Sequence, residues 1–263
     1  MNRRYLTRFA SKLLGSTAVF GCALLSACSS PPEASAVEQG RKLFESKALS
    51  QSHLNDYTCA TCHDTVASDP PSKKTGSALA GVTLRPSFWG DQVGDLLGAV
   101  NACRSNFMGD TQLLSPNDAQ ARSLYAYLVS LEPGVSDAIP FTVVNTIEAL
   151  PRAETAEGNA DAANHGQLLY AQACASCHGS MHEGTGRLSS RVPILPEQTI
   201  AEHAQYSHRV QRLIFTEKIR HGLFLGYGGN MPPFSTELLS DQDVSDVLEA
   251  FGVLGAVLDD DAQ

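Results

Sequence analysis

Basic residues are scarce in this chain. Its 263 residues include 28 Asp and Glu against 19 Lys and Arg, so the formal net charge is −9. Four of the basic residues and no acidic residue lie within the first 27 positions, so a chain without that segment would carry −13, four units below −9. Nucleic-acid binding needs a basic face for phosphate contacts. We therefore expect no nucleic-acid partner, and we expect protein partners with basic docking patches.

Several motifs and long apolar runs are also missing. The sequence contains no glycine-rich phosphate loop and nothing that resembles a hydrolytic triad. The apolar stretch over residues 13–25 is interrupted by Gly15, Ser16, Thr17 and Gly21. It is too short and too broken for a stable transmembrane helix.

That stretch fits an export signal instead. Arg3, Arg4, Arg8 and Lys12 form a positive region before it, and it ends in Leu25-Ser26-Ala27-Cys28, which resembles a bacterial lipobox. We predict a signal peptide over residues 1–27, lipidation of Cys28, and a polar tether over residues 28–35. The alternative is an ordinary signal peptide that is cut nearby. The lipid would anchor the chain in the bacterial cell envelope, facing the periplasm, in either leaflet.

Two copies of one pentapeptide organise the rest of the chain. They are Cys59-Ala60-Thr61-Cys62-His63 and Cys174-Ala175-Ser176-Cys177-His178, and each is a Cys-x-x-Cys-His motif. This is the attachment signature of a c-type haem, in which two thiols add to the two vinyl groups of one porphyrin and the His binds the iron. We predict two covalent haem c groups. Haem I is held by Cys59, Cys62 and His63, and haem II by Cys174, Cys177 and His178.

Two other uses of paired cysteines are weaker. A zinc ion on four cysteines is possible in principle, but the pairs lie 115 residues apart and each is followed at once by His. A thioredoxin-like redox pair needs a strand before the motif, and neither motif has a strand pattern before it.

Helical patterns surround both motifs. They cover residues 36–47, 92–107, 116–131, 162–173, 205–221 and 240–254. Gly40 and Phe44 recur as Gly166 and Tyr170 at the same four-residue offset, which indicates an internal repeat. In each pair the Gly would allow a close helix crossing, and the aromatic ring would cover a haem edge.

These patterns predict an all-α fold with two tandem class I cytochrome c domains after the signal peptide. Domain I would cover residues 36–134 and domain II residues 161–256. Residues 135–160 would form a linker, part of which packs on a domain through Phe141 and its apolar neighbours. An acidic tail would follow over residues 257–263.

Met231 is the predicted sixth ligand of haem II. It follows a Gly-rich loop, precedes Pro232-Pro233, and lies just before the last predicted helix. A thioether ligand raises the potential of a haem. On the proximal side, Arg191-Val192-Pro193-Ile194-Leu195 resembles the segment whose Pro carbonyl accepts a hydrogen bond from the haem-binding His.

Haem I has two candidate sixth ligands, Cys103 and Met108, which lie 40 and 45 residues after His63. Cys103 is the odd cysteine if Cys22 leaves with the signal, Cys28 is lipidated and four cysteines hold haem. An odd cysteine in an exported protein indicates metal ligation, an intermolecular bridge or a reactive thiol, and a buried inert thiol is the alternative. Trp89, the only tryptophan, either lines the haem pocket or belongs to the core.

The segment Asn101-Ala102-Cys103-Arg104-Ser105-Asn106-Phe107-Met108-Gly109 resembles the Asn-x-Cys-x-x-x-x-Met segment of two-haem thiosulfate dehydrogenases. In that family the Cys ligates the catalytic haem, so the resemblance implies that Cys103 ligates haem I. Asn106 and Phe107 stand where the family has an Arg-Ser pair. The run from Gly40 to Cys59 also resembles two-haem cytochrome c peroxidases.

Three functions remain open on the sequence alone. The first is a lipid-anchored carrier that relays electrons between redox proteins. The second is an oxidoreductase that acts on a sulfur compound at haem I, with Cys103 as a thiolate ligand or nucleophile. A cytochrome c peroxidase is a further variant of the second. The third is a subunit or sensor that docks on a larger respiratory complex.

Overall fold

The computed structural model describes residues 34–144, 161–226 and 230–253, and all of them belong to one compact unit. Within these ranges the regular structure is helical, apart from an isolated bridge between Phe88 and Val93. The all-α prediction is therefore confirmed for the described part of the chain. The predicted signal peptide, Cys28, most of the tether, residues 145–160 of the linker and the acidic tail lie outside it. No described helix is long and apolar enough to span a bilayer.

The first half contains four α-helices and two short 3₁₀ helices among the described residues. They are α1 (Ala34–Glu45), η1 (Lys47–Leu49), α2 (Cys59–Cys62), η2 (Val82–Leu84), α3 (Leu96–Asn106) and α4 (Ala119–Val129). Three starts differ from the predicted ones. Helix α1 begins at Ala34, two residues before residue 36, so it includes the last two residues of the predicted tether. Asp95 caps α3 by accepting the Gly98 N–H, so the helix begins after residue 92. The predicted start at residue 116 takes Ser115 as the N-cap and Pro116 as the first helical residue. The Asp118 carboxylate instead accepts the Ser115 N–H in a turn, and the helix begins at Ala119.

The second half contains α6 (Ala162–Ala173), α7 (Ala175–His178), α8 (Glu197–Glu202), α9 (His208–His221) and α10 (Asp241–Ala250). Ser240 and Asp243 form the predicted start of α10 as a reciprocal capping box. Ser207 caps α9, which therefore begins three residues later than predicted. The sequence patterns missed α8, which is only six residues long.

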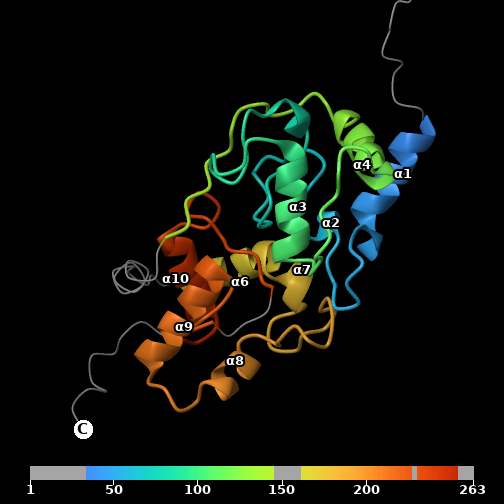
Figure 1. Ribbon diagram of the computed structural model, residues 1–263. Coiled ribbons are helices and arrows are strands. Elements are labelled where there is room, and N and C mark those ends of the chain that lie inside the picture. Colours follow the sequence, from blue (N-terminus) through green and yellow to red (C-terminus); the bar gives the residue numbers. More distant parts are fainter. Residues whose placement is uncertain (1–33, 145–160, 227–229, 254–263) are drawn as a thin grey trace, which may run out of the picture. The chain divides into compact units, whose positions relative to one another are not determined.

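One helix crossing occurs twice, and glycine makes it possible each time (Figure 1). In the crossing of α1 and α4, a Cβ on Gly40 would lie 2.0 Å from the carbonyl oxygen of Ser123. In the crossing of α6 and α10, a Cβ on Gly166 would lie 1.9 Å from the carbonyl oxygen of Asp246. Only glycine permits so close an approach of two backbones. The predicted role of both glycines is confirmed.

In each half, the aromatic residue one turn after the glycine packs against a second aromatic ring. The rings of Phe44 and Tyr127 lie 5.5 Å apart, and those of Tyr170 and Phe251 lie 5.8 Å apart. Each pair belongs to a separate hydrophobic cluster, one in each half of the described chain. Each half therefore has its own core, built on a glycine-mediated crossing between its first and last long helices.

Candidate haem sites

The first Cys-x-x-Cys-His motif opens onto a cavity of about 330 Å³ with mostly apolar walls. Cys59, Cys62 and His63 line this cavity, and so do Cys103 and Met108. The structure thus brings together the two thiols, the imidazole and both candidate sixth ligands that the sequence predicts for haem I. Phe44 also lines the cavity, as the repeat predicts.

Each motif is folded as a single helical turn, which places its two cysteines on one side. In α2 the hydroxyl of Thr58 accepts the Thr61 N–H, and the Thr61 side chain accepts the Thr58 N–H in return. The turn closes where the His63 N–H donates to the Cys59 carbonyl at 2.9 Å. In the second motif the His178 N–H donates to the Cys174 carbonyl at the same distance.

Both motif histidines donate their Nδ1 proton to a backbone carbonyl. His63 Nδ1 lies 2.8 Å from the Ser77 oxygen, and His178 Nδ1 lies 2.9 Å from the Pro193 oxygen. A carbonyl can only accept, so Nδ1 carries the proton and Nε2 keeps its lone pair for a metal. Burial lowers the pKa of both imidazoles against the opposing effect of these carbonyls, which favours the neutral ligand form.

The contact to Pro193 confirms the expectation from the sequence, whereas the contact to Ser77 was missed. The loop between Asp64 and Ser77 shows no periodicity, so nothing in its pattern pointed to His63. The one sequence feature that fits this contact is the glycine at position 76. A Cβ there would lie 2.4 Å from Cε1 of the His63 imidazole, so the loop can approach His63 only with glycine at this position.

Cys103 lies in the last turn of α3 and is half-buried, and Met108 follows the helix and is buried. Burial raises the pKa of the Cys103 thiol to about 12, and nearby Cys59 adds to the rise. Such a thiol stays protonated at neutral pH unless a cation stabilises its thiolate, as a haem iron would. Met108 is 5% exposed and belongs to the hydrophobic cluster of the first half. Both side chains line the cavity, so the identity of the sixth ligand of haem I stays open between Cys103 and Met108.

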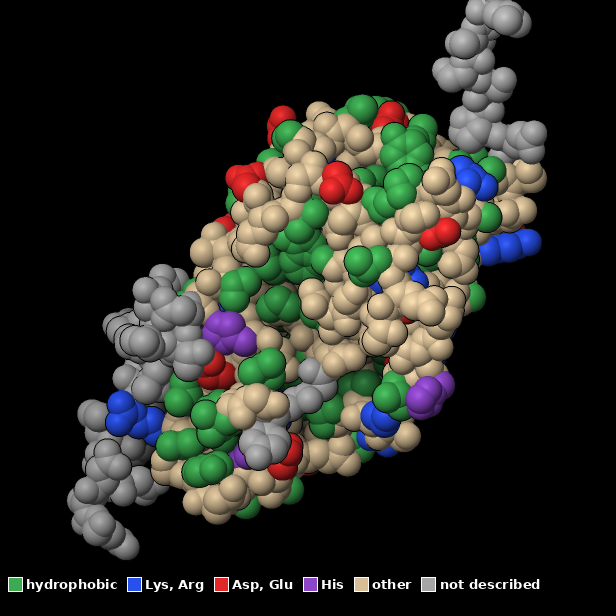
Figure 2. All heavy atoms as spheres, viewed as in Figure 1, with side chains coloured by type: hydrophobic (Ala, Val, Ile, Leu, Met, Phe, Trp, Pro, Cys, Tyr) green, Lys and Arg blue, Asp and Glu red, His purple; other side chains and the backbone are tan. Residues whose placement is uncertain are grey.

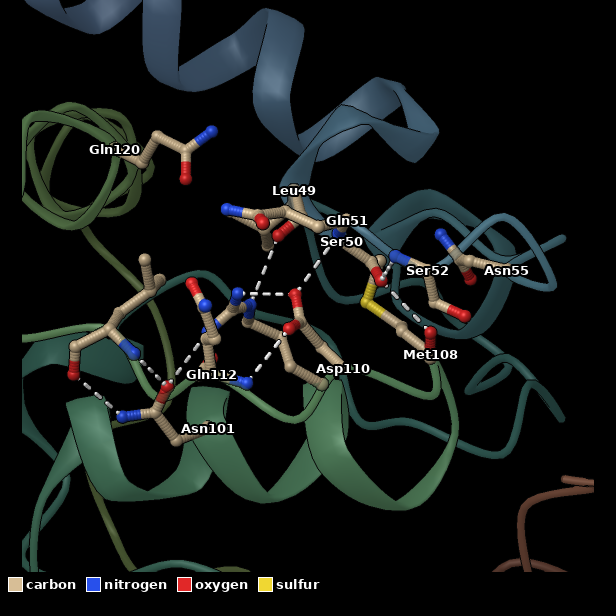
Figure 3. A network of polar contacts seen from close by, with 12 residues as sticks. Leu49, Ser50, Gln51, Ser52, Asn55, Asn101, Met108, Asp110, Gln112 and Gln120 are labelled. Atoms are coloured by element: carbon tan, nitrogen blue, oxygen red, sulfur yellow. Dashed lines mark hydrogen bonds and ion pairs between the residues drawn. The ribbon is translucent and has the colours of Figure 1, made fainter.

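A buried polar network holds the loop that carries Met108 (Figure 3). At its centre Arg104 and Asp110, each 3% exposed, form an ion pair at 2.5 Å. Arg104 also donates to the carbonyls of Leu49 and Gln112. The Ser50 hydroxyl donates to the Met108 carbonyl at 2.9 Å. Since these bonds tie the loop to the segment after α1, Met108 is held from two sides. The sequence patterns did not predict this network.

Met231 is held by the turn at the end of α9. Gly222 ends that helix in the left-handed conformation, with φ of +76°, and a Cβ there would lie 2.0 Å from the Met231 carbonyl oxygen. Met231 packs against the hydrophobic cluster of the second half, which includes Cys174. Pro232 and Pro233, the next two residues, line the cavity of the first motif. Residues 227–229 of the Gly-rich loop lie outside the described ranges.

Trp89 lines the cavity, which decides between the two roles open for it. Its ring stacks on Phe107 at 5.9 Å and meets Phe141 edge-on at 5.4 Å. Phe141 comes from the predicted linker and also lines the cavity. The Thr142 N–H beside it donates to the Glu237 carboxylate. The expectation that part of the linker packs on a domain is therefore confirmed.

The four motif cysteines do not converge on a site of their own. Across the described ranges, no three His, Cys, Asp or Glu side chains are grouped as ligands of a free metal ion. The four-cysteine zinc site is not formed in this part of the structure.

Residues 161–249 match the family described as cytochrome c oxidase, cbb3-type, subunit III. The matched stretch contains the second motif, the carbonyl-bonded His178 and Met231. The chain contains a c-type cytochrome domain. A cytochrome c domain carries covalently bound haem c and transfers electrons. No curated protein matches the chain.

The cytochrome domain consists of α6 to α10, and its donor set fits a haem. Two cysteines on one helical turn, an imidazole with a free Nε2 and a half-buried thioether on a constrained loop are the groups that a six-coordinate haem c requires. The first half lies outside the matched stretch. It nevertheless has its own motif, a carbonyl-bonded His63, and the same helix crossing.

Proposed function

We propose that the chain is an exported two-haem cytochrome c that relays electrons between redox proteins of the bacterial cell envelope. The repetition of the cytochrome arrangement in the first half carries this proposal. Residues 36–134 contain the attachment motif, the hydrogen-bonded imidazole of His63, the crossing at Gly40 and a cavity of about 330 Å³. The motif, the carbonyl-bonded imidazole and the glycine crossing recur at His178 and Gly166 in the cytochrome domain.

The residues around haem I have separable tasks. When bound, the haem supplies reversible one-electron chemistry. Cys59 and Cys62 anchor it, and His63 presents Nε2 to the iron because Ser77 holds the other ring nitrogen. The apolar walls exclude water, which raises the cost of charge changes at the iron and so tunes its potential.

Electron transfer between the two haems is supported by the position of the segment after Met231. Pro232 is buried, and both Pro232 and Pro233 line the cavity of haem I. The loop that ligates haem II therefore borders the pocket of haem I. In our proposal the two motifs would hold their haems on either side of this shared wall, and the haems would supply the one-electron chemistry of the relay.

Counting haems tests the proposal directly. The purified protein should contain two haems per chain and take up two electrons in a reductive titration. Replacing Cys59 and Cys62 by Ser should remove one haem and leave one, and so should the same change at Cys174 and Cys177. A wild-type chain with a single haem would overturn the two-haem proposal.

A second function is favoured by the buried thiol of Cys103 in the haem I cavity. If this thiol ligates haem I, the site could oxidise a sulfur compound such as thiosulfate, and haem II with Met231 would carry the electrons away. Cys103→Ala would then abolish a low-potential thiolate signal and thiosulfate-dependent reduction of the haems, whereas Met108→Leu would not. The relay predicts the opposite, with loss of a sulfur-to-iron charge-transfer band in Met108→Leu only. A peroxidase activity at haem I is a weaker variant, tested by adding peroxide to the reduced protein.

Anchoring through Cys28 completes the proposal, and it rests on the lipobox-like sequence alone. In cells, Cys28→Ala should move the protein from the membrane fraction to the soluble periplasmic fraction without loss of haem. Unchanged membrane association would contradict the lipid anchor. The proposed partners are redox proteins, including a respiratory complex. Acidic side chains are scattered over the face in Figure 2, so negative charge is not gathered into one patch on that face.

A further inference from the structure

We propose that Thr75 and Asn230 are positioning residues for Met231, the proposed ligand of haem II. Their hydrogen bonds tie the loop that carries Met231 to segments that surround haem I. The inference rests on the two-haem proposal above. It concerns residues 73–77, which we call the proximal strap because Ser77, its last residue, accepts the hydrogen bond of His63.

One set of contacts fixes the proximal strap to the first motif. The Lys74 ammonium donates to the Ala60 carbonyl at 3.1 Å and pairs with Asp64 at 2.8 Å. The Gly76 N–H donates to the Cys62 carbonyl at 2.9 Å. The strap is therefore anchored along the haem I motif at Ala60, Cys62, His63 and Asp64.

Another set of contacts joins the same strap to the cytochrome domain. The Lys73 ammonium donates to the Leu238 carbonyl at 2.8 Å and lies 3.4 Å from the Asp243 carboxylate. The Thr75 hydroxyl donates to the Pro233 carbonyl at 2.9 Å. Pro233 is two residues after Met231, so one short segment links the proximal ligand of haem I to the sixth-ligand loop of haem II.

A second hydrogen bond holds the other side of that loop. The Asn230 amide donates to the Phe107 carbonyl at 3.1 Å. Phe107 is the residue before Met108, and its N–H donates to the Cys103 carbonyl at the end of α3. Met231 is thus bracketed by two bonds, one residue before it and two residues after it. One bond ends beside the candidate sixth ligands of haem I, and the other ends on the strap whose Ser77 holds His63.

The two hydrogen bonds on either side of Met231 should have a measurable effect on haem II. A net hydrogen bond contributes about 1 kcal/mol, which corresponds to about a 5-fold change in an equilibrium. Loss of the Thr75 bond should therefore weaken retention of Met231 on the iron about 5-fold. Loss of the more exposed Asn230 bond should have a smaller effect, about 2-fold. Because thioether ligation raises the potential of a haem, both changes should lower the potential of haem II.

Competition with imidazole tests this in the full-length holoprotein. A Met108→Leu background makes the sulfur-to-iron charge-transfer band a reporter of Met231 alone. Titrating imidazole into the oxidised protein then measures how readily Met231 leaves the iron. Thr75→Val should raise the apparent imidazole affinity about 5-fold and Asn230→Ala about 2-fold. Thr75→Ser, which keeps the hydroxyl, should behave as the parent.

The matched control is Thr83→Val. Thr83 donates to Glu132 within the first half, and neither residue belongs to the Met231 loop, so imidazole affinity should not change. Equal imidazole affinities in the parent, Thr75→Val and Asn230→Ala proteins, with both haems bound, would overturn the inference and leave the two-haem proposal intact. A parent with one haem would instead overturn the two-haem proposal. If Thr75→Val and Thr75→Ser both lose haem, Thr75 has a merely structural role and its assignment falls, while Asn230→Ala still tests the other bond.

Discussion

A single methyl group added at each helix crossing should destabilise the protein. The Cβ of Gly40→Ala would lie 2.0 Å from the Ser123 carbonyl oxygen, and that of Gly166→Ala 1.9 Å from the Asp246 oxygen, whereas ordinary contacts begin at 3.4 Å. Each crossing must therefore open by about 1.4 Å. Overpacking of this kind costs about 1–3 kcal/mol. We expect values near 3 kcal/mol, because the obstructing atoms are backbone that cannot rotate away.

Gly94→Ala provides a matched control. A Cβ at Gly94 would meet no atom within 4 Å. An unstrained Gly-to-Ala change stabilises by about 0.4–1 kcal/mol, because it restricts the unfolded chain. Denaturant unfolding of the three holoproteins, followed by helical circular dichroism, gives the free energy of unfolding for each.

The same variants also test whether the halves act as separate haem sites. Gly40→Ala should shift Phe44, which lines the haem I cavity, and so perturb the absorption spectrum and potential of haem I alone. Gly166→Ala should shift Tyr170 and perturb haem II alone. A free energy of unfolding for either variant that equals that of Gly94→Ala would show that the crossing tolerates a Cβ. Equal changes at both haems in each variant would show that the two halves are not separate haem sites.

Further predictions concern the two sixth-ligand loops. Gly222→Ala places a Cβ 2.0 Å from the Met231 carbonyl and strains a left-handed position, so the charge-transfer band of haem II should disappear from the oxidised spectrum; an intact band would contradict this. Asp110→Asn leaves Arg104 buried without its counter-charge and should cost about 3–5 kcal/mol in denaturant unfolding; a loss below about 1 kcal/mol would refute it. Burial opposes ionisation of Asp110, but the Gln112 N–H, other backbone donors and the guanidinium outweigh it and lower the pKa. The stability that this lowered pKa confers is present above the ordinary Asp pKa of about 3.9 and is lost as the pH falls through the folded value, so the gap between wild type and Asp110→Asn should narrow in acid.

Local features of the sequence determined much of what the structure contains. The two Cys-x-x-Cys-His motifs form single helical turns because the two cysteines are spaced by one turn, and in the first motif the adjacent Thr58 caps that turn. The start of α10 at Ser240 and the end of α9 at Gly222 follow from side chains and backbone conformations within four residues. The crossings at Gly40 and Gly166 were predictable because a Gly and an aromatic residue recur at the same offset.

Helix starts were less predictable where two caps compete. The prediction took Ser115 as the N-cap with Pro116 at the first helical position and placed Asp118 in the first turn, although Asp118 is itself a residue type that favours an N-cap. In the fold the Asp118 carboxylate bonds back to the Ser115 N–H, which makes a turn and delays the helix. The outcome depends on the approach of the chain from the preceding loop, which no local pattern encodes.

Only the tertiary structure decided how the two haem sites are supported. The carbonyl of Ser77 reaches His63 across a loop without periodicity, and Arg104 binds acceptors on two separate segments, at Leu49 and in the loop of Asp110 and Gln112. The bonds from Thr75 and Asn230 to the opposite half join residues more than 120 positions apart. The sequence determined which groups could bind a haem, because attachment chemistry is local. The fold decided which segments hold those groups in place, because such contacts depend on how distant loops meet in space.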